Sequence, residues 1–423
     1  MKKNSESGAL LTIGVIVLIL AVIAAVSFSG DKLMADPVPV PEKTEAPSSL
    51  PTPQPAADAQ DPQTEPAPEE EAQPRTHTDF AAIYALHDPE DVVMTVDGRD
   101  VTWQEYFFAF YSQADNMEQT FEMYQYYGMA VGWQDQADEE GHSYAELVAA
   151  LGEQDLRQIL LAETLAKEEN VSLLPEEEEA VQADHQDLIA RFCGEDGTEE
   201  QLFQMLWEER WLSREMYWQI LRYDALLQAS LRGLYGEEGS LLTEQQVLDW
   251  MEEQSIVSAD HILISTIDAE TNQRLDDAAA EEKAELARQI AGELQAIEDP
   301  AKLEARFQEL KAEHGEDPGA EEGGYVFGPG VMVQDFYDGT QALEIGQVSD
   351  PVQTSYGYHV ILRRPLHADD VVLTVSGEQS ARSLMAQSLF NAVIQERYDA
   401  QVIAYAPGFE APNVLDYQVA VEP

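Results

Sequence analysis

The sequence contains a single cysteine, Cys193, and few basic side chains. One cysteine excludes an intramolecular disulfide and any zinc or iron–sulfur site built from cysteines. Only 23 Lys and Arg residues stand against 81 Asp and Glu residues, so the formal net charge of the 423-residue chain is −58. A surface this acidic repels phosphate backbones and anionic lipid headgroups, and we therefore expect no nucleic-acid partner.

Several common functional motifs are also absent. The chain has no P-loop, no dinucleotide-binding glycine motif, no HExxH zinc motif and no GxSxG nucleophile motif. We therefore expect no cofactor and no bound metal. Hydrophobic residues make up 44% of the chain, which is enough to form cores, and the length suggests two or three domains.

An uncharged apolar run occupies residues 8–28, shortly after Lys2 and Lys3. At about 1.5 Å per residue, a helix of this length crosses a hydrocarbon core roughly 30 Å thick. The positive-inside rule then makes residues 1–30 a cytoplasmic tail and single-pass anchor in the cell membrane, with the C-terminal bulk extracytoplasmic. A cleaved signal peptide is the alternative, since Ala25-Val26-Ser27 resembles a cleavage site, but signal sequences have apolar runs of only about 7–15 residues.

We expect residues 31–79 to form a disordered linker. They hold 11 of the chain's 21 prolines, and most of the other residues are Ala, Glu, Asp, Gln, Ser and Thr. Such a stretch cannot bury enough apolar surface to offset the entropy of ordering it. The prolines favour an extended polyproline II stalk between the anchor and the folded part.

Residues 80–254 are expected to form a mainly helical lobe. Residues 92–103 alternate around Asp97-Gly98, which predicts a hairpin, and the pair Thr102 and Glu105 is a capping box that begins a helix. Further helices are expected over residues 144–170, 176–192, 198–231 and 243–254, two of which begin with the capping boxes Thr198 to Gln201 and Thr243 to Gln246.

The helix expected over 198–231 has an unusually wide apolar side, broadened by Trp207, Trp211 and Trp218. Two interpretations are open. The side chains form the core of the lobe, which we favour, or they form a methionine- and aromatic-rich cradle for unfolded chains.

The composition changes at Ser255, and residues 255–366 alternate strand and helix patterns typical of an α+β domain. We expect strands over 256–266, 347–349 and 358–362, helices over 278–297 and 300–314, and a glycine-rich loop over 317–330. Residues 367–423 then add a strand (371–377), a helix (380–404) and an irregular tail from Pro407, and we expect the strand and helix to pack on the lobe.

Two histidines, His261 and His359, each lie within an apolar strand of this small domain. One histidine in an apolar strand is usually a core residue with a satisfied hydrogen bond. Two of them in one small sheet should lie close together in space, which favours a functional site.

Five segments follow one another within about 110 residues: Ala259-Asp260-His261-Ile262-Leu263, residues 314–319 leading to Gly323-Gly324, residues 331–336, residues 345–352, and residues 354–361. Together they resemble the parvulin type of peptidyl-prolyl isomerase. The flanking hairpin and helix before the domain, and the strand and helix after it, resemble the chaperone lobe of exported foldases of this family. The resemblance implies a parvulin-like domain inserted in a helical chaperone lobe.

The resemblance also implies site residues. The family's paired histidines correspond to His261 and His359, its Cys or Asp position to Asp317, and a nearby hydroxyl to Thr354. The pocket for the proline ring corresponds to Met332, Phe336 and Val326. We interpret the histidines as neutral members of a hydrogen-bonded network, because amide rotation needs no nucleophile and no proton shuttle.

The implied function is a membrane-anchored extracytoplasmic prolyl isomerase and chaperone, whose partners are unfolded exported polypeptides with X-Pro bonds and, through residues 8–28, the lipid bilayer. The loop 265–277 carries Arg274 alone among acidic residues, so phosphorylated substrates are disfavoured. The sequence does not define the oligomeric state.

Two alternatives remain open. Tyr325-Val326-Phe327 replaces the family's usual Asp-Leu-Gly, which suggests a non-catalytic holdase that retains an isomerase-like binding domain. A metal enzyme that uses His261, His314, His359 and Asp317 is the other, although their spacing lacks any short ligand pair.

Overall fold

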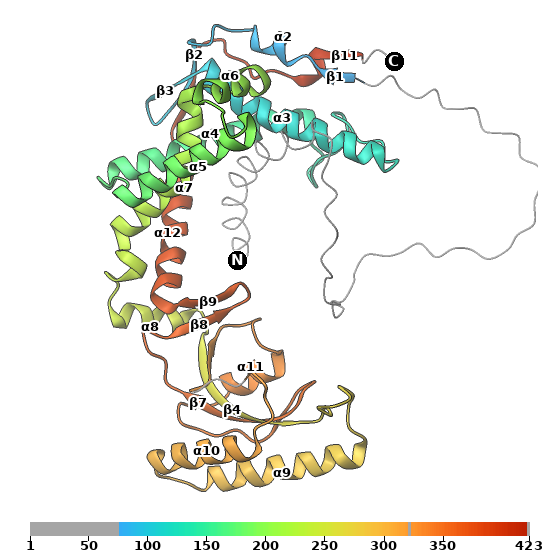
Figure 1. Ribbon diagram of the computed structural model, residues 1–423, viewed down its shortest axis with the longest axis vertical. Helices are drawn as coiled ribbons and strands as arrows, with labels where there is room; N and C mark the ends of the chain where they lie inside the picture. Colours follow the sequence, from blue (N-terminus) through green and yellow to red (C-terminus); the bar gives the residue numbers. More distant parts are fainter. Residues whose placement is uncertain (1–75, 320–322, 421–423) are drawn as a thin grey trace, which may run out of the picture. The chain divides into compact units, whose positions relative to one another are not determined.

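The computed structural model describes residues 76–319 and 323–420, which divide into two compact units (Figure 1). Within the described residues, the first, which we call the helical unit, comprises 76–160, 182–221 and 401–420. The second, the sheet unit, comprises 161–181 and 222–400. Three of the four boundaries between the units fall inside helices α4, α5 and α7, and the fourth falls at the end of α12 (Ala381–Ala400).

The helical unit begins with short elements and continues as helices. They are β1 (Thr76–Thr78), α2 (Phe80–Tyr84), β2 (Val92–Val96), β3 (Arg99–Thr102), α3 (Trp103–Tyr126), α4 (Tyr144–Glu168), α5 (Pro175–Cys193), α6 (Glu199–Arg210) and α7 (Arg214–Tyr235). Asp97 and Gly98 both have positive φ, as the predicted tight hairpin turn requires. The predicted capping boxes of α3 and α6 are both confirmed.

The core of the helical unit is aromatic. Trp103, Phe107 and Phe110 of α3 are almost fully buried, and Leu206 and Met216 of the following helices pack in the same cluster. The core interpretation of the wide apolar side is therefore the better one, although Trp207 remains 41% exposed.

The expectation of a single helix over 198–231 is wrong, because the helix is interrupted at Trp211. Trp211 adopts a left-handed conformation (φ 55°) and caps the end of α6. Ser213 directly precedes α7, and its hydroxyl accepts a hydrogen bond from the Met216 N–H at 3.2 Å. Periodicity alone does not show this break, since the apolar stripe continues through it.

Both ends of the described chain form strands in this unit. β1 pairs with β11 (Gln418–Ala420), and β10 (Ile403–Tyr405) pairs with β2. The predicted linker is therefore wrong at residues 76–78, and the tail from Pro407 is not wholly irregular. The rest of that linker, and the expected anchor at 8–28, lie outside the described residues. Among residues 76–319 and 323–420, no helix combines the length and apolar character of a membrane span.

The sheet unit is built on a six-stranded sheet in the order β6-β7-β4-β5-β8-β9. The strands are β4 (Val257–Ser265), β5 (Tyr325–Phe327), β6 (Val352–Gln353), β7 (Gly357–Arg364), β8 (Val371–Thr374) and β9 (Gly377–Ser380). The helices are α8 (Glu244–Glu253), α9 (Asp277–Gln295), α10 (Pro300–His314), α11 (Gln334–Gln341) and α12 (Ala381–Ala400), with single-turn helices at Glu237–Gly239 and, in the helical unit, at Val414–Tyr417.

Helices cover both faces of β4 and β7. In Figure 1, α9 and α10 lie on one side and α11 on the other. Ile262 and Val360 pack against α9 and α10, whereas Ala259 and Ile361 pack against Phe336 of α11. The alternation of side chains along each strand thus separates the face covered by α9 and α10 from the face covered by α11, which holds the candidate site.

Several details differ from the sequence prediction. The glycine-rich loop expected over 317–330 contains the strand β5, and the helix expected over 380–404 ends at Ala400, before β10. The strand expected over 347–349 is reduced to a single bridge between Val348 and Leu362. The C-terminal strand β8 does more than pack on the lobe, because it pairs in parallel with β5 through Phe327 and Leu373.

Candidate active site

Two histidines lie on the same face of the sheet, on neighbouring strands. In the antiparallel register His261 of β4 pairs with Ile361, and Leu263 pairs with His359 of β7, so the imidazoles are diagonal neighbours. Their Nδ1 atoms are 3.2 Å apart, and both side chains are buried. The predicted meeting of the two histidines is confirmed.

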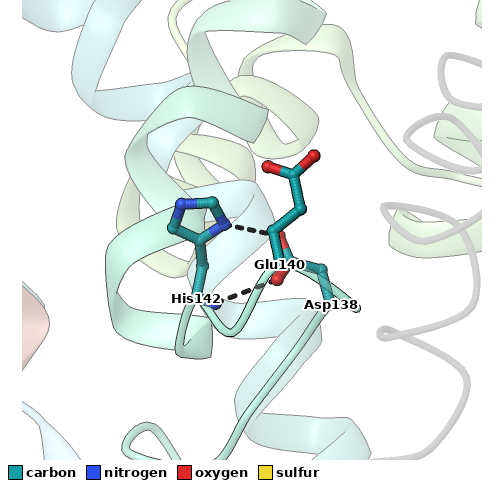
Figure 2. A group of neighbouring side chains, drawn as sticks. All are labelled: Asp138, Glu140 and His142. Atoms are coloured by element: carbon teal, nitrogen blue, oxygen red, sulfur yellow. Dashed lines mark hydrogen bonds and ion pairs between the residues drawn. The ribbon is translucent and has the colours of Figure 1, made fainter.

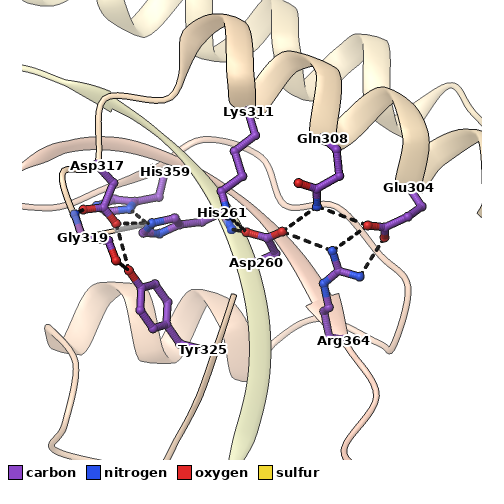
Figure 3. Close-up of polar contacts among 10 residues, drawn as sticks. All are labelled: Asp260, His261, Glu304, Gln308, Lys311, Asp317, Gly319, Tyr325, His359 and Arg364. Atoms are coloured by element: carbon purple, nitrogen blue, oxygen red, sulfur yellow. Dashed lines mark hydrogen bonds and ion pairs between the residues drawn. The ribbon is translucent and has the colours of Figure 1, made fainter. Parts of the chain in front are cut away.

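A continuous chain of hydrogen bonds runs through the imidazoles. His261 Nε2 lies 2.8 Å from Asp317 Oδ2 (Figure 3), and His359 Nε2 lies 2.9 Å from Thr354 Oγ1. An ionised carboxylate only accepts, so His261 Nε2–H donates to Asp317, and His261 Nδ1 accepts from His359 Nδ1–H. His359 Nε2 then accepts from the Thr354 hydroxyl. Every member is satisfied with both imidazoles neutral.

The pKa shifts agree with this assignment. Burial lowers the pKa of His359 to about 3, assisted by the neighbouring His261. Burial also lowers the pKa of His261, against the opposing effect of Asp317. Burial alone would raise the pKa of Asp317, but the hydrogen bonds that its carboxylate accepts outweigh burial and hold the pKa below its usual range. The site is therefore an anionic carboxylate joined to two neutral rings.

Asp317 is held in place by the residue before it. The Glu316 N–H donates to the Leu263 carbonyl at 2.9 Å, which extends β4 pairing to this loop. The Glu316 carboxylate accepts from the Ser265 N–H at 2.7 Å and from Lys283 Nζ at 2.6 Å. These contacts fix the backbone that carries Asp317 beside His261.

An aromatic surface lies against the histidine pair. The Phe336 ring centroid is 5.0 Å from that of His261 and 5.1 Å from that of His359. Phe327 packs on Phe336 at 5.6 Å, and Met332 packs half-buried against the same cluster. The structure therefore brings Met332 and Phe336 to the site, as predicted.

Val326 does not belong to this surface. Side chains alternate along β5, so Tyr325 and Phe327 face the site and Val326 faces the other way. Val326 packs with the cluster that contains Met251 and, with Ser258 and Arg364, lines a cavity of about 450 Å³. The expectation that Val326 forms a wall of the proline pocket is wrong.

Tyr325 is a site residue that the sequence reasoning missed. Its hydroxyl lies 3.3 Å from Asp317 Oδ2 and bonds the Gly319 carbonyl, and its ring meets the His261 ring edge-on at 5.8 Å (Figure 3). The signal was available, because Tyr325 lies within the segment that departs from the family pattern, and strand alternation places it on the opposite face from Val326.

The opposite face of β4 carries a buried ion-pair network (Figure 3). The fully buried Asp260 carboxylate accepts from Lys311 Nζ at 2.7 Å, Gln308 Nε2 at 2.8 Å and Arg364 Nη2 at 3.1 Å. Arg364 also pairs with Glu304 at 2.7 Å. Burial raises the pKa of Asp260, but these hydrogen bonds outweigh it and the pKa lies below its usual range. The network ties α10, whose end leads into the site loop, to β4 and β7.

The metal site considered from the sequence is not formed. His314 Nε2 lies 3.6 Å from the neighbouring Glu313 carboxylate, and His261 and His359 bond each other instead of a shared centre. In the described part of the chain, a different group of three His, Cys, Asp or Glu side chains has its ligand atoms within 4.8 Å of one another.

That group is Asp138, Glu140 and His142, in a loop of the helical unit (Figure 2). His142 Nδ1 lies 2.6 Å from Asp138 Oδ2, while Asp138 Oδ1 accepts from the backbone N–H groups of Gly141 and His142. Both Glu140 and His142 are exposed. These bonds are those of a turn, and they account for the arrangement without a metal.

We expect the two site histidines to stay neutral down to pH 5. In a ¹⁵N NMR titration of the full chain, their imidazole shifts should remain those of neutral rings, whereas His142 should gain its proton above the ordinary midpoint because its hydrogen bond to Asp138 raises its pKa. Since the pKa of His359 is about 3 when folded and about 6.5 when unfolded, its contribution to stability is complete above pH 6.5 and falls as the pH decreases towards 3. Protonation of either site ring near pH 6.5 would contradict the assignment.

Comparison with protein families identifies the sheet unit's central part. Residues 261–364 match the family model described as Rotamase: PPIC-type PPIASE domain. The match runs from His261 to Arg364 and includes the whole hydrogen-bonded chain. The chain therefore contains a PPIC-type parvulin domain, which confirms the resemblance seen in the sequence.

Curated relatives of this chain are foldases and chaperones. Foldase protein PrsA 4 of Bacillus cereus is 50% identical over 58 residues, 13% of this chain and 21% of that protein. Foldase protein PrsA of Geobacillus kaustophilus is 46% identical over 77 residues, 17% of this chain and 27% of that protein. Chaperone SurA of Chromohalobacter salexigens is 31% identical over 188 residues, 44% of this chain and 36% of that protein. The matches thus span between about a fifth and about a third of the relatives' own lengths.

Among solved structures, the peptidylprolyl isomerase PrsA from Bacillus anthracis shares 20% sequence identity with this chain. The alignment covers 57% of this chain and 88% of that chain, with a TM-score of 0.21.

Proposed function

We propose that this protein is a peptidyl-prolyl cis-trans isomerase and chaperone that assists the folding of exported proteins. The observation that carries the proposal is the hydrogen-bonded chain from the Asp317 carboxylate through the neutral His261 and His359 rings to Thr354, directly against the Phe336 ring. The family match over residues 261–364 and the foldase relatives support it.

The reaction requires rotation about an amide bond, which resists with a barrier of about 18–20 kcal/mol because the nitrogen lone pair is delocalised. The task is to bind the twisted amide better than the planar one. Phe336 and Met332 hold the proline ring by apolar contact. The Asp317 carboxylate is partly exposed, and its role in the proposal is to oppose the partial negative charge of a planar amide oxygen, which weakens the C–N double-bond character.

The histidines keep this carboxylate oriented. His261 Nε2–H holds one Asp317 oxygen, and the remaining bonds of the chain fix the tautomers of both rings. Because both rings are buried and neutral, they contribute fixed dipoles and no net charge. We assign catalytic roles to Asp317, His261, His359 and Thr354, and substrate binding to Phe336 and Met332.

The substrates are proposed to be unphosphorylated X-Pro segments. Lys283, beside the site loop, is already paired with Glu316, while Lys311 and Arg364 pair with Asp260 on the opposite face of the sheet. An arriving phosphate would therefore meet the carboxylates of Glu316 and Asp317.

Residues 8–28 are proposed to anchor the protein in the cell membrane, with the C-terminal bulk extracytoplasmic and residues 31–75 as a stalk. The support is the uncharged apolar run after Lys2 and Lys3. Membrane fractionation combined with N-terminal sequencing of the mature protein should find an uncleaved chain in the membrane fraction. Soluble protein that begins near residue 28 would show a cleaved signal peptide instead.

The isomerase activity is tested on the full chain with a short X-Pro peptide. We expect the protein to accelerate cis/trans exchange, which takes tens to hundreds of seconds unaided, in proportion to protein concentration, as measured by NMR exchange spectroscopy. The same preparation is tested for suppression of aggregation of a refolding client. Suppression with an uncatalysed peptide rate, at protein concentrations equal to that of the peptide, would leave only the holdase alternative.

A further inference from the structure

Tyr325 begins β5, and the glycine before it sets its position. Gly324 has a positive φ of +84°, and a Cβ placed there would lie 2.2 Å from the Ala259 carbonyl oxygen, so only glycine allows β5 to approach β4 this closely. In the resulting register Tyr325 pairs with Ala259, on the face that carries His261.

The Tyr325 hydroxyl lies within hydrogen-bond distance of two oxygen acceptors in the loop that carries the catalytic carboxylate, and they share its single proton. One is Asp317 Oδ2, at 3.3 Å, and the other is the Gly319 carbonyl. The Gly319 N–H in turn donates to Asp317 Oδ1 at 3.0 Å. The hydroxyl therefore closes a small ring of hydrogen bonds around the carboxylate that also accepts from His261 (Figure 3).

We infer that Tyr325 is a positioning residue for the proposed reaction, whose hydroxyl holds Asp317 Oδ2 against His261 Nε2–H. The inference rests on the proposed function. Without the hydroxyl, the half-buried carboxylate keeps its bond to His261 but loses the contact that ties its loop to β5. The carboxylate then samples more orientations, and the His261 Nε2–H exchanges with water more often.

The contact is specific to the hydroxyl group. The Tyr325 ring meets the His261 ring edge-on at 5.8 Å and packs against the cluster of Phe327 and Phe336. Tyr325→Phe keeps both ring contacts and removes only the oxygen, so it separates positioning from packing. Because the hydrogen bond to Tyr325 is one of the contacts that lower the pKa of Asp317, the same change should move the acid limb of the activity profile to higher pH.

The matched control is Tyr358→Phe. Tyr358 lies in β7 next to His359, but it packs against the core under α9 and α10, on the opposite face from Asp317. Both variants remove one tyrosine hydroxyl from the same sheet. Only the first removes a hydroxyl that contacts the carboxylate.

The test measures X-Pro exchange and the solvent exchange of the ¹⁵N-labelled His261 Nε2–H in the full chain. For Tyr325→Phe we expect kcat to fall about 10-fold with KM unchanged, and the Nε2–H exchange to speed up about 10-fold, because a hydrogen bond to a charged group is lost. Tyr358→Phe should leave both unchanged. Wild-type values for Tyr325→Phe, or equal losses in the two variants, would overturn the inference.

The proton readout is independent of turnover. If the wild-type chain proves inactive, the proposed function fails, while faster Nε2–H exchange in Tyr325→Phe alone would still establish the positioning contact. Unchanged exchange in that variant would overturn the contact even in an active enzyme.

Discussion

Replacing Phe336 with alanine is expected to lower kcat/KM for X-Pro isomerisation by about 100-fold, a loss of about 2.7 kcal/mol of transition-state stabilisation. The Phe336 ring lies within 5.1 Å of both imidazole centroids and packs in one cluster with the half-buried Met332, so we place it at the floor of the surface on which a proline ring would rest. Alanine removes that surface. The measurement is NMR exchange on an X-Pro peptide, with near-UV circular dichroism to confirm that the variant is folded.

The control for Phe336→Ala is Phe307→Ala. Phe307 of α10 is fully buried on the opposite side of the sheet, in the core between the sheet and helices α9 and α10. Both changes create a cavity that costs about 3–5 kcal/mol of stability, so both proteins are compared under conditions that keep them folded. Phe336→Leu, which preserves burial but not the flat ring, should give an intermediate loss. Unaltered turnover in folded Phe336→Ala would remove the residue from the pocket.

Asp260→Asn is expected to lower the free energy of unfolding of the sheet unit by about 3–5 kcal/mol. The substitution keeps the shape of the side chain but leaves Lys311 and Arg364 facing a neutral amide in a fully buried position. Hydrogen–deuterium exchange of the β4 and β7 peptides in the full chain reports this unit without interference from the helical unit.

The comparison for Asp260→Asn is an exposed ion pair of the same domain. Glu281 pairs with Arg288 at 2.6 Å, with side chains 70% and 50% exposed, and such a pair contributes about 0–1 kcal/mol. Glu281→Gln should therefore change the exchange of β4 and β7 very little. If Asp260→Asn has an equally small effect, the burial of the Asp260 network does not determine how much the network contributes to the stability of the sheet unit.

The sequence predicted the meeting of the two histidines for a physical reason. His261 and His359 each stand within an apolar strand, and one small sheet offers few places for two such strands other than side by side. The resemblance to the parvulin family then pointed to Asp317, Thr354, Met332 and Phe336, all of which the structure brings to one face.

The errors concern features that local pattern does not contain. Val326 was misplaced because the facing direction in a three-residue strand depends on register with β4, which the glycines before it set. The Asp260 network was missed because its partners come from α10 and β7, 48 to 104 residues away. The break at Trp211 depends on a left-handed conformation that a bulky side chain rarely adopts.

The pairing of β1 with β11 and of β2 with β10 has a consequence for the order of assembly during synthesis. Thr76 must wait for Ala420, so the helical unit begins before the sheet unit along the chain but is completed only after the sheet unit has been synthesised. All six strands of the other sheet are available once residue 380 has been translated. The isomerase domain can therefore finish folding while the two short sheets of the helical unit still lack their final strands.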